Sequence, residues 1–574
     1  MPFNPLSPGV YTQEVDLTTS VPSVSVSTGG FAGTFNWGPV LKVTSINQET
    51  QLNSRFGDPD NNTAVSFFSC ASFLAYSNAL QVARAAGSGA NNATANGAGV
   101  VINNEDDYFN LWYSTTVTGN PWTARYPGAL GNSLKVIAWT SNTAWIADSQ
   151  NANSPYYTFA NQFPFGPNTS PWLSNLSNGA KTGDELHIIV IDTNGLITGQ
   201  ANTVLEKYQG VSRLTDAQTP LGANNYYRAV LFNQSRYIYN SGIPSPNANS
   251  WGVAAAAWVA ANAGAENVAN AFALSGGKDG NVSTANLETA WGLFANVEQV
   301  DVGLLFTGDA SNVLQSYVTQ SVAQIRQDAV AFMSPPLANT QDNTGPGASI
   351  VNYANQLNSR SSYAVMDSGW KYMYDKYNDT YRWIPLNADI AGLCAQTDNL
   401  RDPWWSPAGL QRGTIKNAVK LAYNPGKTDR DSLYSAGVNP VVSFPGQGTI
   451  LFGDKTFLNY ASAFDHINVR RLFITLEKAI SRAAKTSLFE FNDAFTRAQF
   501  VSLITPYLTT VKGRRGITDF KVVCDQTNNT ADIIRSNKFV GDIYIVPNYS
   551  INYIQLNFVA VQNGVSFNTV VGQF

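Results

Sequence analysis

Apolar residues alternate with polar ones near both ends of the 574-residue chain. The stretch from Val10 to Val15 follows three prolines that exclude a helix, and its alternation predicts an extended arm. Residues 551–561 alternate in the same way and predict a terminal strand. A terminal strand with one apolar face must bury that face in its own sheet or in the sheet of another chain. On these residues alone both outcomes stay open.

In other segments the spacing of apolar residues is typical of buried strands or of helices. Continuous apolar runs over residues 300–306 and 329–333, with helical spacing over 313–325 between them, predict a parallel βαβ unit. A helix is expected from Asp58 to Gly87. An Ala-rich packed helix is expected from Trp251 to Leu274, where Asn and Glu interrupt the apolar run and argue against membrane insertion.

Residues 100–260 contain short β-like runs, including 134–139 and 186–192, between positions rich in Pro, Gly and Asn. Helical spacing returns over 468–485 and 493–507. A chain of this length exceeds what one hydrophobic core usually organises. The patterns together predict a mixed α+β and α/β multidomain protein that carries a mostly β insertion.

Composition favours a protein that contacts other copies over a broad surface. Charged residues make up 13% of the chain, about half the usual share, and neutral amides and hydroxyls take their place. The net charge of −4 argues against wholesale binding of nucleic acid or acidic membranes. No Lys or Arg precedes Lys42, so no signal peptide is expected and synthesis is expected in a cytoplasm. Three distant cysteines, Cys70, Cys394 and Cys524, are expected to be core thiols.

Patterns typical of enzymes and metal sites are missing from the sequence. His187 and His466 are the only histidines, and neither has metal-ligand spacing, so both are expected to be packed or hydrogen-bonded. The Gly426-Lys427-Thr428 tripeptide lacks the upstream glycine of a phosphate loop, because Leu421 stands there. We therefore expect no catalytic residue, no metal, no cofactor and no enzymatic activity.

Positive charge is concentrated between His466 and Lys521, where ten basic residues stand against four acidic ones. This segment has a charge of +6, and the remainder of the chain has −10. Lys478, Arg482 and Lys485 stand at i, i+4 and i+7, which places them on one helix face. The face is either solvated or in contact with a negatively charged partner.

Blocks along the whole chain resemble the contractile tail sheath proteins of T-even-like myophages. Among them are LSPGV at residues 6–10, YDKYND at 374–379, ADIAGLCA at 388–395, FGDKT at 452–456 and INVRRLF at 467–473. They occur in the order that the family has. One departure is that the interval before Tyr126-Pro127-Gly128 is short beside the longest family members, so the outermost β domain is expected to be absent or reduced.

The resemblance implies a tail-sheath fold, with a C-terminal α/β core completed by N- and C-terminal arms and a mostly β outer insertion. It implies a homo-oligomer of stacked hexameric rings around a tail tube protein, with baseplate and tail terminator proteins as further partners. The virion tail would be assembled in the host cytoplasm. Its contraction would drive the tube through the host envelope for genome ejection, without direct contact to nucleic acid.

The resemblance also implies roles for particular residues. Strands of the arms would join neighbouring copies through Val10, Tyr11, Val15, Ile554, Leu556 and Phe558. Lys478, Arg482 and Lys485 would face an acidic tube. The implied domains are 1–20 (N-terminal arm), 21–87 with 265–424 (middle α/β domain), 88–264 (outer β-rich insertion), 425–549 (inner tube-facing domain) and 550–574 (C-terminal arm).

Two alternatives stay open on the sequence. The chain could be the sheath of a tailocin or another contractile injection system, which shares the mechanism. From a different class, a glycan-binding or hydrolytic virion protein would use exposed aromatic residues of the β region, such as Trp112, Trp122 and Trp139, although packing is their default role.

Overall fold

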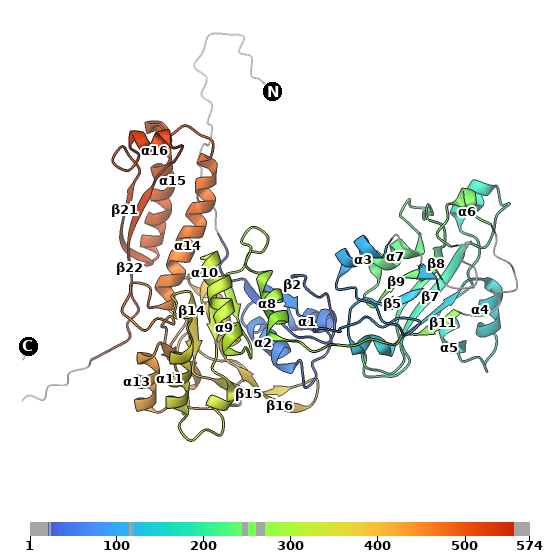
Figure 1. Ribbon diagram of the computed structural model, residues 1–574, viewed down its shortest axis with the longest axis horizontal. Helices are drawn as coiled ribbons and strands as arrows, with labels where there is room; N and C mark the ends of the chain where they lie inside the picture. The colour runs from blue at the N-terminus through green and yellow to red at the C-terminus, as the bar shows by residue number, and fades with distance from the viewer. Residues whose placement is uncertain are drawn as a thin grey trace, which may run out of the picture. The chain divides into compact units, whose positions relative to one another are not determined.

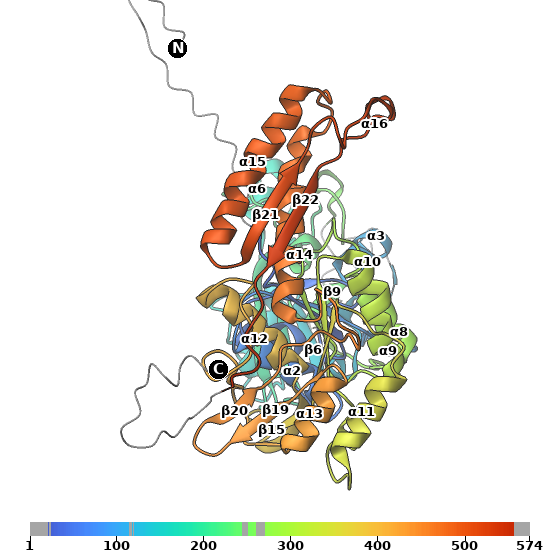
Figure 2. The same ribbon diagram turned by 90° about the vertical axis from the view of Figure 1, so that its left-hand side faces the viewer.

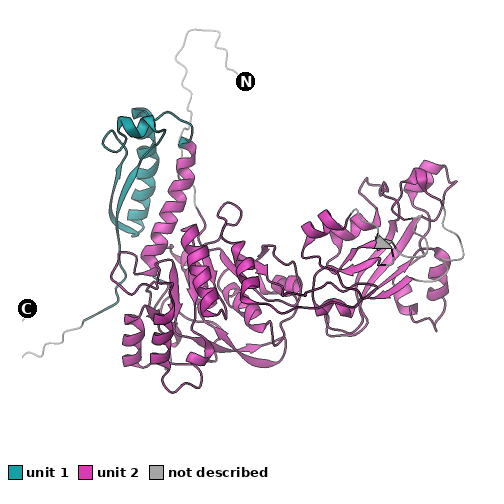
Figure 3. Cartoon of the chain, viewed as in Figure 1, with its two compact units in different colours: residues 1–20, 404–406, 487–574 teal, residues 21–403, 407–486 magenta. Residues whose placement is uncertain are grey.

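The computed structural model describes residues 21, 24–113, 117–118, 120–243, 251–259 and 270–555 (Figure 1). They form two compact units (Figure 3). The first consists of 21–403 with 407–486, and the second contains 404–406 with 487–555. The predicted arm residues Val10, Tyr11, Val15, Leu556 and Phe558 lie outside the described residues.

A seven-stranded sheet organises the first unit, and all neighbouring strands in it are parallel except β2 and β3. Its strands, in spatial order, are β18 (Val438–Asn439), β14 (Ala364–Asp367), β13 (Val330–Met333), β12 (Leu304–Phe306), β1 (Gly29–Gly33), β3 (Leu80–Arg84) and β2 (Thr44–Ile46). Leu305 of β12 stands opposite Ala331 of β13, which confirms the predicted βαβ unit. The connecting helix runs through α9 (Asn312–Tyr317), a π-helical stretch (Val318–Ala323) and α10 (Gln324–Arg326).

Helices cover both faces of this sheet. The crossovers from β1 to β3 and from β12 to β13 run in opposite directions, so right-handed connections place α2 (Ala64–Leu74) and α9 on opposite faces. On one face α2 packs against α12 (Asn387–Leu400), and on the other α8 (Thr284–Gly292) packs against α9 (Figure 2). Because both faces are buried, the central strands β12 and β13 are continuous apolar runs without alternation.

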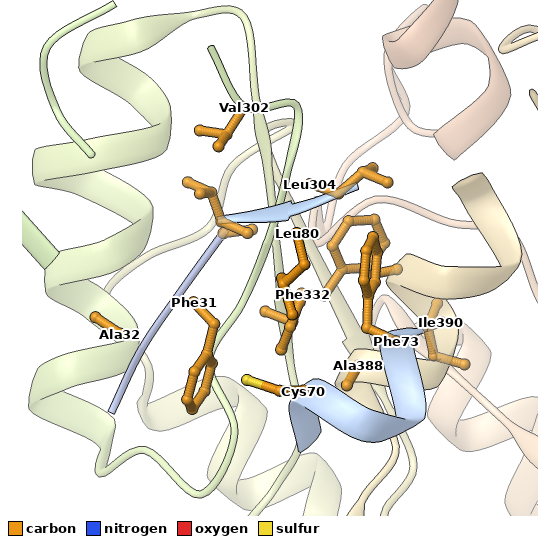
Figure 4. Packing of buried hydrophobic residues seen from close by; sticks show 14 of the residues in the cluster. Phe31, Ala32, Cys70, Phe73, Leu80, Val302, Leu304, Phe332, Ala388 and Ile390 are labelled. Atoms are coloured by element: carbon orange, nitrogen blue, oxygen red, sulfur yellow. The ribbon is translucent and has the colours of Figure 1, made fainter. Parts of the chain in front are cut away.

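Three phenylalanine rings form the centre of the first unit's core. Phe306 stacks on Phe31 and on Phe73, with both centroid distances 5.2 Å. Phe31 and Phe73 gather with Cys70 beside the sheet (Figure 4). A Cβ atom at Gly29 would lie 2.6 Å from the Phe73 ring, so glycine in β1 permits this close approach.

The β-rich part of the first unit contains an antiparallel sheet of β11 (Asn270–Ala273), β6 (Leu134–Trp139), β7 (Glu185–Asp192) and β8 (Thr203–Ser212), in that order. The two strands predicted at 134–139 and 186–192 are therefore confirmed. Trp122 and Trp139 are fully buried, and the indole of Trp139 donates a hydrogen bond to Asp148 over 2.8 Å. Both side chains pack, and neither is available to a glycan.

Two predicted elements differ from the structure, and a third is described only in part. The helix expected from Asp58 to Gly87 ends at Leu74, because residues 80–84 form β3 in the central sheet. The expected helix 251–274 is, where described, a short 3-10 turn at 255–257 and strand β11, whose pairing with β6 overrides the helical propensity of alanine. Of the terminal strand predicted at 551–561, residues 551–555 form no strand in the single chain, and the remainder lies outside the described residues.

The rest of the first unit and the second unit contain smaller elements that matter below. An antiparallel sheet joins β16 (Thr380–Pro385), β15 (Trp370–Asp375) and β17 (Lys420–Leu421). The first unit also contains α11 (Pro346–Gln356), α13 (Lys427–Ser435), β19 (Val441–Phe444), β20 (Gly448–Leu451) and α14 (Ile467–Ala484). The second unit has α15 (Ala494–Gly513), β21 (Ile517–Val523), α16 (Ala531–Arg535) and β22 (Asp542–Pro547).

Removal of the Phe306 ring should destabilise the first unit, since both of its stacking partners would then border a cavity. We expect F306A to lower the free energy of unfolding by about 3–5 kcal/mol. Phe165, which is 57% exposed, provides the matched control, and F165A should change stability by less than about 1 kcal/mol. Urea unfolding followed by circular dichroism measures both. Equal losses for the two variants would contradict the assignment of Phe306 to the core.

Candidate assembly surfaces

The basic face predicted on residues 478–485 lies on helix α14 and at its C-terminal end. Lys478 and Arg482 both pair with the carboxylate of Asp301, Arg482 over 3.6 Å, so one acidic side chain bridges two of the three cations. The ammonium of Lys478 also donates to the Ser25 carbonyl over 3.0 Å. Lys485 is exposed and has no ion-pair partner among the described residues. The face therefore keeps positive charge at Arg482 and Lys485, while Lys478 is largely satisfied internally.

Several other basic residues of the 466–521 segment are structural. Arg471 is buried and makes a bidentate pair with Asp398 at 2.8 and 2.5 Å. Arg470 is 4% exposed, and its guanidinium lies 4.4 Å from the ring centroid of Tyr363. Arg497 is buried and donates to the backbone and side chain of Asn492. The charge count along the sequence thus overstates the charge that this segment presents to a partner.

A two-stranded antiparallel sheet, β21 with β22, dominates the second unit (Figure 2). Helix α15 packs against it with residues four apart, Phe500, Ile504 and Leu508, which are buried on one stripe. A Cβ atom at Gly541 would lie 2.6 Å from the Phe500 ring, so glycine brings the chain entering β22 close to the helix. Asn529 accepts from the Val540 amide and donates to the Val540 carbonyl, which holds the connection between the strands.

Both strands of this small sheet have an unpaired edge among the described residues. β21 pairs only with β22, and no third strand adjoins either of them. A two-stranded sheet is marginal in water, and a row of free N–H and C=O groups is a template for further strands. The face away from the interior carries Tyr544 and Val546, which are 59% and 53% exposed. The unit therefore presents both the hydrogen-bonding edge and the apolar surface that an added strand would cover.

The chain that leaves β22 is apolar and exposed. Ile551, Tyr553 and Ile554 are 82%, 84% and 78% exposed. The side chain of Ile554, one of the residues predicted to join neighbouring copies, is exposed to solvent in the single chain. Large apolar side chains exposed together usually mark an interaction site.

Histidines, cysteines and the Gly426-Lys427-Thr428 tripeptide have structural roles. His187 is buried, and its Nδ1 accepts from the Gly210 amide over 3.0 Å, so its Nε2 carries the proton that is donated to the Phe165 carbonyl. Burial lowers the pKa of the His187 imidazole. All three cysteines are free and buried, as expected. Residues 427–435 form helix α13.

The described residues include no group of three or more His, Cys, Asp or Glu side chains arranged to hold a metal ion. None of the helices in this part of the chain is long and apolar enough to cross a membrane.

One buried acid stands at the carboxyl end of the parallel strands. Asp367, at the end of β14, accepts from the Ser334 hydroxyl over 2.7 Å and from the Gly369 amide over 2.8 Å. Burial, with a smaller contribution from the charge of Asp389, raises the pKa of the Asp367 carboxyl to about 8 despite these hydrogen bonds. The sequence pattern contained no signal for this group, because its environment includes Ser334, which follows β13, and Asp389 in helix α12. Asp367 is 1% exposed, so it holds strands together and meets no substrate.

Comparison with known proteins decides the family. The family model described as the phage tail sheath protein central domain matches residues 280–457, and that of the phage tail sheath C-terminal domain matches 460–560. The tail sheath protein of Vibrio phage KVP40 is 33% identical over 99% of this chain and 100% of its own length. This chain belongs to the tail sheath proteins. It is a structural subunit of a contractile tail sheath of the T-even-like myophage kind.

Further relatives support the same assignment. The tail sheath protein of Enterobacteria phage T4 is 32% identical over 99% of both chains. The alignment to the KVP40 protein runs over 681 positions, so at least 107 of them (681 less 574) lie opposite no residue of this chain. That difference agrees with the expectation that this chain is shorter than the longest members. Its location, before Tyr126-Pro127-Gly128, stays a prediction.

Solved structures establish the same fold. The sheath tail protein of Desulfitobacterium hafniense is 13% identical, covers 94% of this chain and 100% of its own, and has a TM-score of 0.51. That of Listeria innocua is 11% identical, covers 91% and 94%, and has a TM-score of 0.50. The predicted tail-sheath fold is confirmed at the level of architecture.

Stability of the first unit should depend on pH through Asp367. The folded pKa of about 8 exceeds the ordinary value, so the folded state keeps a proton that the unfolded chain releases. Stability from this group is complete below about pH 4 and falls as pH rises towards 8, by at most about 1.4 kcal/mol per pH unit.

The D367N variant should therefore lose less stability than the parent between pH 5 and pH 8. Thermal unfolding at both pH values measures the difference. D342N, at an exposed aspartate, should behave like the parent. An unchanged pH dependence in D367N would remove Asp367 from this role.

Proposed function

We propose that copies of this chain polymerise as hexameric rings stacked helically around a tail tube, with each copy joined to its neighbours by its terminal arms. The open edges of the β21–β22 sheet carry this proposal, because a strand from another copy would satisfy their free backbone groups. The Val10–Val15 stretch and the residues around Ile554, Leu556 and Phe558 have the alternation that such added strands need. Baseplate and tail terminator proteins are the expected partners at the two ends of the stack.

Main-chain pairing suits a sheath that changes length. Backbone hydrogen bonds between strands hold copies together while the units that they connect rotate against each other. Assembly on the tube would trap an extended state, and contraction would release free energy through new contacts between subunits. No nucleotide is needed, in agreement with the incomplete phosphate loop at Gly426 and with a non-enzymatic role. The contraction drives the tube through the host envelope as part of a virion that is assembled in the host cytoplasm.

The basic face of α14 is proposed to contact an acidic tube in the extended state. Arg482 is 47% exposed at its side chain and Lys485 is exposed, which leaves both available to a partner. Contacts between exposed charges are weak and screened by salt, so they can be released during contraction. The proposed domain division is that given by the resemblance, with 425–549 on the tube side and 88–264 on the outside.

Deletion of either arm should prevent polymerisation. We expect the recombinant full chain to form tubular polymers in electron micrographs, and variants that lack residues 1–20 or 550–574 to form none. Circular dichroism should show that both variants keep the folded units. Polymers that persist in both deletion variants would contradict joining by the arms.

Charge reversal on α14 should weaken binding to purified tubes. R482E/K485E should reduce co-sedimentation by about fivefold at low salt and have little effect at 0.5 M salt, where exposed charges are screened. Lys478 stays unchanged in this variant because it also holds Asp301. K207E/R236E changes two exposed cations of the β-rich part by the same charge and serves as the control. Equal binding by both variants would exclude this face from tube contact.

A further inference from the structure

The β15–β16 hairpin presents an aromatic surface where a polar one is expected. Tyr372 stands opposite Trp383, and Tyr374 stands opposite Tyr381, so the four rings share one face of the hairpin. We call this the aromatic face. Tyr374 and Tyr381 are 46% and 49% exposed, and Tyr372 and Trp383 are half-buried. The outward face of an antiparallel sheet is usually polar, so four adjacent rings there suggest a contact surface.

The inward side of the same hairpin fixes this orientation. Met373 and Ile384 are buried in the core of the first unit. Asp375 is buried and accepts from the Arg382 guanidinium over 2.6 Å. Because strand side chains alternate, these inward contacts hold the aromatic residues outward.

The rings contact one another in a continuous surface, and polar groups lie next to it. Tyr372 stacks on Tyr381 at a centroid distance of 5.4 Å and lies 4.7 Å from Trp383. The ammonium of Lys420 on β17 lies 4.9 Å from the Tyr372 ring centroid, so it borders this surface. No described residue accepts a hydrogen bond from the indole N–H of Trp383 or the hydroxyls of Tyr372 and Tyr381. A flat apolar surface with unused donors fits an extended peptide with exposed carbonyl groups.

Polyproline II helices are such peptides, and proline-rich segments bind grooves lined by aromatic rings. The chain itself begins with one candidate. Pro2, Pro5 and Pro8 are spaced by three residues, which is the period of a polyproline II helix. Phe3 and Leu6 follow them on the next face.

The remaining face of that helix carries Asn4 and Ser7. The segment would therefore be amphipathic, with two apolar faces and one polar face. Its fixed proline dihedrals would also reduce the entropy lost on binding.

We infer that the aromatic face binds residues 2–8 of a second copy of this chain. The inference rests on the proposed assembly of copies, and it adds a second joint that uses other residues than the Val10–Val15 strand. Residues 9–20 connect this segment to the described part of the chain, and they can span about 40 Å when extended, a length that allows residues 2–8 to contact a second copy. Residues 2–8 contain no charged side chain, so the segment brings no like charge to Lys420.

Cross-linking between full-length variants tests the contact. A copy with S7C is mixed with a copy with K420C under conditions that allow polymerisation, and a short bismaleimide joins cysteines that lie close. Ser7 is on the polar face of the segment, Lys420 borders the aromatic face, and the three native cysteines are buried. We expect a covalent dimer of S7C with K420C. N151C, in an exposed loop, replaces K420C as the control and should give only background.

Two further variants test whether the contact depends on the proline spacing of residues 2–8 and on the aromatic rings. P5A/P8A in the S7C copy removes the polyproline period, and W383T in the K420C copy removes one ring and keeps strand propensity. Each should lower the yield of the dimer by about fivefold. Equal yields with N151C, or yields that neither variant lowers, would overturn the inference.

Electron micrographs of the same mixtures separate this inference from the proposed assembly. Tubular polymers without the specific cross-link would overturn the second joint and leave the first intact. A specific cross-link without tubular polymers would support the contact and count against the proposed rings. Oligosaccharide binding that W383T abolishes, found together with background cross-linking, would assign the aromatic face to a glycan instead.

Discussion

Unpaired backbone groups at the edges of a two-stranded sheet are the constraint on which this account of the molecule depends. β21 and β22 form hydrogen bonds with each other along one edge of each strand, and α15 covers one face of the sheet. No third strand among the described residues completes the sheet. The apolar residues beyond β22 are likewise exposed in a single chain. We propose that strands from other copies complete the sheet of this second unit.

The first unit, in contrast, has a largely parallel sheet that is covered on both faces. Its core centres on stacked phenylalanines. Such a body transmits force without repacking, because close-packed interiors deform little. Rigid bodies connected by backbone pairing are a suitable design for a sheath whose subunits move relative to one another while staying joined. Charge has a secondary role here. Four of the ten basic residues of the 466–521 segment, Arg470, Arg471, Lys478 and Arg497, hold the fold. Arg482 and Lys485 are exposed, and these two are proposed to make the releasable contact.

The sequence predicted the elements whose period is strong. The βαβ unit, strands β6 and β7, and helices α14 and α15 occur where alternation and helical spacing placed them. Prediction failed where strand pairing with distant residues overrides local propensity. A helix was expected at the residues that form β3, and another at the residues that form β11. Partners that lie far apart in the chain had no local signal. Asp301 beside Lys478, and Ser334 beside Asp367, became visible only in the fold.

Candidate joints were predictable in part. The prolines and the alternation of apolar residues predicted the N-terminal arm, and the family resemblance implied its role. The open edge of the β21–β22 sheet could be recognised only from the strand topology of the folded chain. Hydrogen–deuterium exchange of the backbone amides in residues 517–523 and 542–547, compared between the isolated chain and the polymer, tests that joint most directly. The account predicts strong protection of edge amides on polymerisation, because a strand from another copy would occupy the edge. Unchanged exchange in a polymer confirmed by electron microscopy would contradict it.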